Sequence, residues 1–202
     1  MQQPLLTIAI PTIIQRKKVF TDLENEFKRQ SQKFGEKIEI ISLCDNREMS
    51  IGEKRQRLNE MAKGKYVVQW DDDDWIHPDG IELIMGGIET DVDVISYHYS
   101  SDIGIVDKVN HPRKVSIKYK NVMRDGIWWV SPDPKNPIKK EILDKVRFQD
   151  TSWSEEYYYK LDIKDLLKTE FLIDKYIYMF LNRSGEAYDW EKRYNLKNKK
   201  IL

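Results

Sequence analysis

Apolar and polar residues alternate along the first half of the chain in a pattern that predicts strands separated by helices. The short β-rich runs are residues 5–10, 38–43, 66–70 and 93–99. Residues 17–34 carry apolar side chains at helical spacing, with charged residues between them. Ser50 and Glu53 form a capping box, which predicts a helix to about Lys63. A further helix is expected from 77–79 to about Ile88.

Strands that alternate with helices at this spacing predict a mostly parallel sheet with helices on both faces. We expect the first strand to stop at Pro11, because proline cannot donate to a central strand. Ligands of such sheets bind at the carboxyl ends of the strands. Polar residues follow the first three strands at Pro11-Thr12, Asp45-Asn46 and Asp71 to Asp74. The sequence therefore predicts a binding site at this edge.

The second half of the chain is less regular. Residues 100–131 are expected to form short antiparallel strands and loops, and 132–137 a proline-rich turn. Helices are predicted over about 138–145 and 154–168, and a late β run over 170–181. The charged tail at about 191–200 is expected to fray.

Composition narrows the class of protein. The 202 residues fit one domain, with 40% hydrophobic and 34% charged residues, as in globular proteins. The 34 basic and 34 acidic residues cancel, which argues against a strong general nucleic-acid surface. Cys44 is the single cysteine; we expect it to be a buried small apolar residue in a reducing compartment.

Neither a membrane span nor a signal peptide is evident in the sequence. We therefore expect a soluble, cytoplasmic protein, for which peripheral membrane association stays open.

The aspartate run, Asp71 to Asp74, places four carboxylates on successive residues. In a partly buried site they would repel one another, and a divalent cation would relieve that repulsion. Oxygen ligands select Mg²⁺ or Mn²⁺, which can neutralise a diphosphate. An isolated acidic run favours a solvated turn that caps the next helix. Its position between an apolar strand and Trp75 favours a metal site instead.

Several motifs together resemble the donor-binding core of family 2 glycosyltransferases, which have the GT-A fold. These motifs are Ile8 to Thr12, Asp45, Gly52-Glu53-Lys54-Arg55 and Ala62 to Asp79. The last segment holds an A-x-G-x-Y turn, an apolar strand, a DxD, an aromatic residue and Pro-Asp, in the family's order. The resemblance covers about residues 5–90 and is patchy beyond them.

The resemblance implies a nucleotide-sugar-binding half at about 1–100 and an acceptor half at about 101–202 of a single domain. The implied donor-binding residues are Pro11, Thr12, Asp45, Lys54, Arg55, Asp71 and Asp72. Asp73, with Asp71, is implied to hold Mn²⁺ or Mg²⁺, with the register open by one residue. Without the resemblance, Lys54 and Arg55 would be expected to lie on an exposed face of their helix.

Inverting sugar transfer needs a carboxylate that deprotonates the acceptor hydroxyl. The segment from Phe148 to Glu156 resembles the family's region for this base. Glu156 stands where the family has Asp; Glu155 is the second candidate and Asp150 the third. Both glutamates would also favour the positive end of a helix on structural grounds alone.

Aromatic residues gather in the second half, and flat rings can stack on sugars. Trp128, Trp129 and Trp153 are the candidates for acceptor binding, although most aromatic residues in a domain belong to its core. His98 and His111 are left out of the metal set, and Arg183 to Gly185 is a weak candidate for closing over a diphosphate.

We therefore predict a metal-dependent, inverting glycosyltransferase that uses a nucleoside diphosphate sugar, UDP-linked by resemblance, and a glycan or other hydroxyl acceptor. A nucleotidyltransferase is the first alternative, although residues 11–16 lack the glycine-rich loop of that class. The second alternative is a non-catalytic domain that binds nucleotide or glycan.

Overall fold

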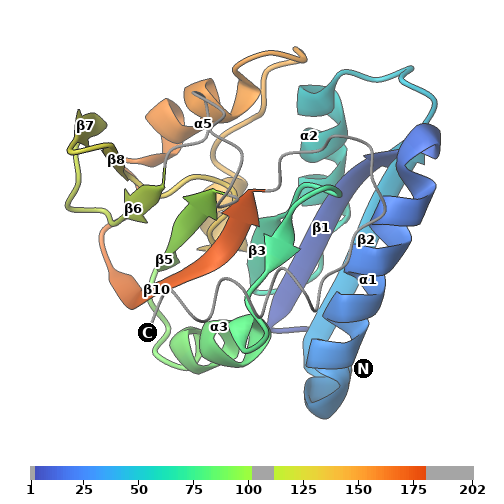
Figure 1. The fold of residues 1–202 in the computed structure, drawn as a ribbon, viewed down its shortest axis with the longest axis horizontal. Coiled ribbons are helices and arrows are strands. Elements are labelled where there is room, and N and C mark those ends of the chain that lie inside the picture. The colour runs from blue at the N-terminus through green and yellow to red at the C-terminus, as the bar shows by residue number, and fades with distance from the viewer. Residues whose placement is uncertain (1–2, 102–111, 181–202) are drawn as a thin grey trace.

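The computed structural model describes residues 3–101 and 112–180, which build a ten-stranded mixed sheet flanked by helices (Figure 1). The strands are β1 (Leu6–Ile13), β2 (Ile38–Asp45), β3 (Tyr66–Gln69), β4 (Trp75–Ile76), β5 (Val94–Ser101), β6 (Arg113–Val115), β7 (Val122–Arg124), β8 (Ile127–Val130), β9 (Ile138–Lys139) and β10 (Glu170–Phe180). The α-helices are α1 (Lys17–Ser31), α2 (Ile51–Met61), α3 (Gly80–Ile88), α4 (Lys140–Leu143) and α5 (Glu155–Ile163). Two 3₁₀ turns, η1 (Ile14–Arg16) and η2 (Gln32–Lys37), flank α1.

The sheet has a parallel core. Strand β1 pairs in parallel with β2 and β3, and β5 pairs in parallel with β10. The short strand β9 runs antiparallel between β3 and β5. The predicted α/β sheet with helices on its faces is confirmed. In the smaller part, β5–β6 and β7–β8 are antiparallel as expected, whereas β6–β8 is parallel.

Helices cover both faces because successive side chains of a strand point to opposite sides. Leu6, Ile8 and Ile10 of β1 pack in one cluster with residues of α1 and α3. Ala9, between them, packs in a second cluster with residues of α2, α4 and α5. Figure 1 shows α2 and α5 near each other at the top and α3 at the bottom. Alternation along the strands thus produces a three-layer arrangement.

The first strand ends at Ile13, three residues beyond the predicted run of 5–10. Pro11 lies inside β1, opposite Leu43 of β2. The pairing of β1 with β3 ends at Ala9, so beyond that residue β1 has one edge without a ladder. A proline is tolerated where no partner needs its missing N–H. The prediction was wrong because β1 pairs with β3 only as far as Ala9 but continues to pair with β2 on its other side.

Other expectations need correction. The predicted helix at 138–145 begins as strand β9, because Ile138 fills the gap between β3 and β5, and α4 ends at Leu143. Helix α5 ends at Ile163 rather than at 168. Cys44 is exposed, since β2 is the last strand on its side of the sheet.

Within the described part of the chain, no helix is long and apolar enough to cross a membrane. His111, Arg183 to Gly185 and the tail at 191–200 lie outside the described residues.

Candidate active site

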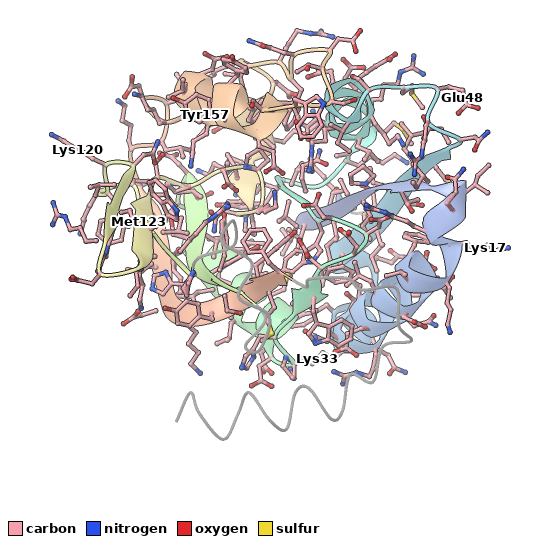
Figure 2. All side chains as sticks on the ribbon, turned by 45° about the horizontal axis from the view of Figure 1, so that its top comes forward. Lys17, Lys33, Glu48, Lys120, Met123 and Tyr157 are labelled. Atoms are coloured by element: carbon pink, nitrogen blue, oxygen red, sulfur yellow. The ribbon has the colours of Figure 1, made fainter. Side chains whose placement is uncertain are left out.

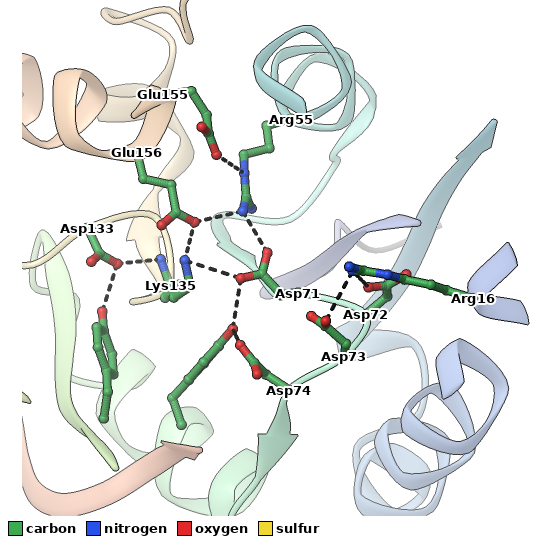
Figure 3. A network of polar contacts seen from close by, with 12 residues as sticks. Arg16, Arg55, Asp71, Asp72, Asp73, Asp74, Asp133, Lys135, Glu155 and Glu156 are labelled. Carbon is green, nitrogen blue, oxygen red and sulfur yellow. Dashed lines mark hydrogen bonds and ion pairs between the residues drawn. The ribbon is translucent and has the colours of Figure 1, made fainter. Parts of the chain in front are cut away.

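The four aspartates follow Trp70, the residue after β3, at the carboxyl edge of the parallel core, as the sequence predicts. The Asp74 amide donates to the carbonyl of Asp71 at 3.2 Å, which turns the chain back toward β4. This turn sends the four carboxylates in different directions. Cationic or hydroxyl groups from other elements contact each of them (Figure 3).

Asp71 lies at the centre of this network. Its Oδ1 accepts a hydrogen bond from Arg55 at 2.6 Å, and its Oδ2 lies 3.4 Å from Lys135 Nζ. The Tyr178 hydroxyl oxygen lies 3.2 Å from Oδ2, although its closer acceptor is Asp74. Burial by itself would raise the pKa of Asp71, but Lys135 and Arg55 outweigh it and hold that pKa well below its ordinary value. Asp71 is therefore a carboxylate at neutral pH.

The other three aspartates contact three side chains, those of Thr12, Arg16 and Tyr178. Asp72 accepts from Thr12 Oγ1 at 2.7 Å and from Arg16 at 2.8 Å. Arg16 also lies 3.2 Å from Asp73. Asp74 accepts from the Tyr178 hydroxyl at 2.5 Å. Arg16 is 46% exposed and Asp73 is 23% exposed, whereas Asp72 is buried. The accessible part of the run is thus at Asp73 and Asp71.

The two glutamates at the start of α5 meet the same cations. Glu156 accepts from Arg55 at 2.7 Å and forms an ion pair with Lys135, although Glu156 and Arg55 are 101 positions apart. Glu155 lies 3.4 Å from Arg55 Nε, and burial raises the pKa of its carboxyl group. Burial would lower the pKa of Lys135, but Asp71 and Glu156 raise it. Two buried cations therefore link the aspartate run to α5.

Helix α2 is positioned by its first turn. Ser50 Oγ accepts from the Glu53 amide at 3.0 Å, which confirms the predicted cap, and donates to Asp150 at 2.6 Å. The Gly52 amide donates to the carbonyl of Thr151 at 3.0 Å. The beginning of α2 is thereby fixed against the segment that leads into α5.

Lys54 and Arg55 are each 3% exposed, so the exposed helix face that they suggest on their own is wrong. Lys54 forms an ion pair with Asp45 and donates to the carbonyl of Thr12 at 2.8 Å, which joins the ends of β1 and β2. Burial would raise the pKa of Asp45, but the Lys54 hydrogen bond lowers it. Pro11 is buried beside Thr12. The predicted donor-side residues therefore lie together, largely turned toward one another.

A pocket of about 460 Å³ lies against α5, and Glu155 and Glu156 are part of its wall. Trp128 lines this pocket. Trp129 instead packs edge-on against Tyr119, with ring centres 4.9 Å apart, and Trp153 is 84% exposed. Of the three tryptophans predicted for the acceptor, Trp128 is the one beside the candidate base.

The site fits a divalent cation that is held partly by its substrate. Among the described residues, no three acidic, histidine or cysteine side chains lie close enough to hold a metal by themselves. Mg²⁺ usually takes one or two carboxylates and completes its shell with water and phosphate oxygens. Asp71 and Asp73, 24% and 23% exposed, offer such a pair. His98 lies elsewhere: it is buried in β5, and its Nε2 is 2.8 Å from Asp174.

Sequence reasoning missed Lys135, Asp133 and Tyr178. Lys135 is 2% exposed, in the loop between β8 and β9 that was predicted as a plain turn. Asp133 Oδ1 accepts from the Tyr99 hydroxyl at 2.8 Å and from the Lys135 amide at 2.9 Å. The sequence did contain one indication of their role. The charged residues in 132–137 stand between prolines, which restrict the backbone and so hold these side chains in fixed positions.

Comparison with known proteins agrees with this geometry. Residues 21–153 match the model of the family described as glycosyl transferase family 2. No curated protein matches the chain. The crystal structure of S. aureus TarS 1-349 in complex with UDP-GlcNAc is similar, with a TM-score of 0.64 and 17% identity. The match covers 92% of this chain and 62% of that one.

The crystal structure of S. aureus TarS is also similar, with a TM-score of 0.62 and 15% identity. This match covers 88% of this chain and 37% of that one. These structures establish the fold, which is GT-A-like as in TarS, and this chain spans less than two thirds of their length. The family model covers more than half of the chain and includes α2, the aspartate run and the approach to α5. The chain therefore belongs to glycosyl transferase family 2.

Proposed function

We propose that this chain is a metal-dependent, inverting glycosyltransferase that moves a sugar from a UDP-linked donor to a hydroxyl of a glycan or another acceptor. Family membership supports the sugar transfer. The UDP-GlcNAc complex of TarS, a protein with the same fold, supports the nucleotide. The prediction that residues 1–202 form a single domain, with a donor half and an acceptor half, also remains a prediction.

One observation carries the proposal. Arg55 and Lys135, both buried, contact Asp71 on one side and Glu156 on the other (Figure 3). Asp71 is in the predicted donor site, and Glu156 is the predicted base. Burying two cations and several carboxylates together is costly unless they are paired with good geometry. A fold that maintains such a cluster beside an open pocket is typical of a site for charged chemistry.

On the donor side, we infer that Thr12, Asp45, Lys54 and Asp72 form the frame around the nucleotide, with Pro11 beside them. Asp73, with Asp71, would hold Mn²⁺ or Mg²⁺. A bound cation of this kind neutralises charge on the departing diphosphate. Arg16 lies beside Asp72 and Asp73 and is half exposed, so it can face the same phosphates.

On the acceptor side, Glu156 is the proposed base. Its Oε1 takes the contacts with both Arg55 and Lys135. Its Oε2 has no hydrogen bond or ion pair with any residue in 3–101 or 112–180 and is left for an acceptor hydroxyl. The acceptor oxygen bonds to the anomeric carbon while the bond to the diphosphate breaks, and the hydroxyl proton passes to Glu156. Glu155 remains the alternative base.

The donor and metal are tested together by thermal unfolding with UDP, in Mn²⁺ and in EDTA. A ligand of the folded state raises the melting temperature, so UDP should do so with Mn²⁺ and far less with EDTA. Asp73→Asn should remove the metal-dependent part, whereas Asp79→Asn, at an exposed aspartate nearby, should retain it. Equal stabilisation by UDP in EDTA would contradict the metal role. Hydrolysis of the UDP-sugar would separate an enzyme from a domain that merely binds nucleotide.

The base is tested by Glu156→Gln, which keeps the shape and removes the basicity. General-base assistance is typically worth about 10²–10⁴-fold, so kcat should fall by that factor with donor binding retained. Glu155→Gln is the matched control and should cost less. If Glu155→Gln is the inactive variant, the base is Glu155. A product that retains the donor's anomeric configuration would refute the inverting mechanism.

A further inference from the structure

The pocket beside Glu156 has a basic wall. Arg113 of β6 is the register partner of Trp128 of β8, so the two side chains leave the same face of the sheet. Both line the pocket, and Lys160 and Tyr157 of α5 line it too. Tyr157 is 53% exposed at the outer surface of α5 (Figure 2). The pocket thus offers two cations and an indole close to the proposed base.

The two cations form no ion pair with a carboxylate of the described residues, although the charge of the buried Asp133 acts on both of them. Neither the Arg113 guanidinium nor the Lys160 ammonium group forms a hydrogen bond or an ion pair within the described part of the chain. The Arg113 guanidinium lies over the Phe180 ring, 4.7 Å from its centre, which holds it in place. Burial lowers the pKa of Lys160; Asp133 opposes this shift and the nearby charge of Arg113 adds to it. Asp133 relieves part of the repulsion between the two cations, and an acidic group of a ligand placed between them would relieve more of it.

The carboxylates around the pocket are already engaged with other groups. Asp133 accepts hydrogen bonds from Tyr99 and from the Lys135 amide. Glu155 and Glu156 face Arg55, and Glu156 also contacts Lys135. Arg113 and Lys160 are therefore the cations of this pocket whose hydrogen-bond donors are available to a ligand.

We propose that the acceptor is a sugar that carries an acidic group, either a carboxylate or a phosphate, and that Arg113 and Lys160 bind this group. This inference rests on the proposed function. The ring of the acceptor lies on Trp128, and one of its hydroxyls reaches Oε2 of Glu156. Arg113 and Lys160 then act as specificity determinants that select charged acceptors.

Binding of glucose, glucuronate and glucose 6-phosphate to the intact chain tests the proposal. The indole N–H signal of Trp128, identified with Trp128→Phe, reports on the pocket by NMR titration. We expect at least one acidic sugar to bind roughly tenfold or more tightly than glucose, as charge-assisted hydrogen bonds allow. The comparison of glucuronate with glucose 6-phosphate shows whether the pocket prefers a carboxylate or a phosphate.

Arg113→Gln and Lys160→Gln should each weaken binding of the acidic sugar roughly tenfold and leave glucose unchanged. Lys164→Gln, at the exposed residue that follows the end of α5, removes the same charge outside the pocket and should have no effect. The proposal is refuted if neither acidic sugar binds more tightly than glucose, or if Lys164→Gln weakens binding as much as Lys160→Gln.

Failure of this inference can be told from failure of the proposed function. If UDP binds with Mn²⁺ but the acidic sugars do not bind, the acceptor assignment alone is wrong. If the acidic sugars bind at Trp128 but neither UDP nor a UDP-sugar binds, the anion site stands and the transferase proposal is wrong.

Discussion

Replacing Lys135 with methionine should destabilise the protein measurably, because it removes a buried charge that two carboxylates share. Methionine has nearly the length of lysine and adapts to irregular space, so packing changes little. Lys135 Nζ lies 3.4 Å from Asp71 and forms an ion pair with Glu156. Without it, Arg55 is left to face Asp71, Glu155 and Glu156 alone.

Breaking a buried ion pair by removing one partner costs about 3–5 kcal/mol. The side chains of Asp71 and Glu156 are 24% and 25% exposed, so water can reach both carboxylates. Arg55 also remains in contact with each. We therefore expect the free energy of unfolding to fall by about 2–3 kcal/mol at pH 7, below the full cost of an isolated buried charge.

The loss should depend on pH. The folded pKa of Asp71 is lowered, so its stabilisation is complete above its unfolded pKa, about 4, and is lost as the pH falls through the folded pKa. The raised pKa of Lys135 keeps it charged throughout the acidic and neutral range. The difference between wild type and Lys135→Met should therefore be largest near neutral pH and narrow below about pH 4.

Urea unfolding at pH 7, 5 and 3 measures this difference, since urea does not screen charges. Lys65→Met is the control: its Nζ lies 2.9 Å from Asp91, but the two side chains are 46% and 59% exposed. Water screens an exposed pair, so Lys65→Met should lose far less stability than Lys135→Met. A loss below about 0.5 kcal/mol for Lys135→Met, or an equal loss at pH 3 and pH 7, would refute the reasoning.

Two further changes probe the surroundings of the site. In Gly52→Ala, the new Cβ would lie 1.9 Å from the Gln149 carbonyl oxygen, so the contact of α2 with 149–151 must open. We expect the free energy of unfolding, measured in urea, to fall by roughly 1–3 kcal/mol. Gly86→Ala is the control and should have a small effect, because its Cβ meets open space. His98 Nδ1 accepts from the Val115 amide at 3.1 Å, and burial lowers the pKa of the ring. The contribution of neutral His98 to stability is complete above the unfolded pKa of about 6.5 and is lost as the pH falls through the folded pKa. Wild type should therefore lose stability between pH 7 and 5, and His98→Gln should lose less. Parallel curves of stability against pH for the two proteins would contradict this.

The sequence by itself determined the local elements and one edge of the site. Alternating apolar runs and helical spacing predicted β1 to β3 with their helices, and the Ser50 cap was placed correctly. These features depend on neighbours within a few positions, which a sequence displays directly. The aspartate run was predicted at the carboxyl edge because each parallel strand of an α/β sheet ends there.

The tertiary structure decided which charges meet. Lys135 and Arg55 lie far apart along the chain, and nothing in the residues around either one distinguishes it from an exposed cation. Both are buried in the folded protein. Pro11 and Ile138 took strand positions for a similar reason, since the neighbouring strands, rather than local propensity, decide where pairing begins and ends. Contacts between residues tens of positions apart leave no periodic trace in one sequence. The link between Asp71 and Glu156 through two buried cations therefore became visible only when the folded sheet brought α2, α5 and the loop before β9 together.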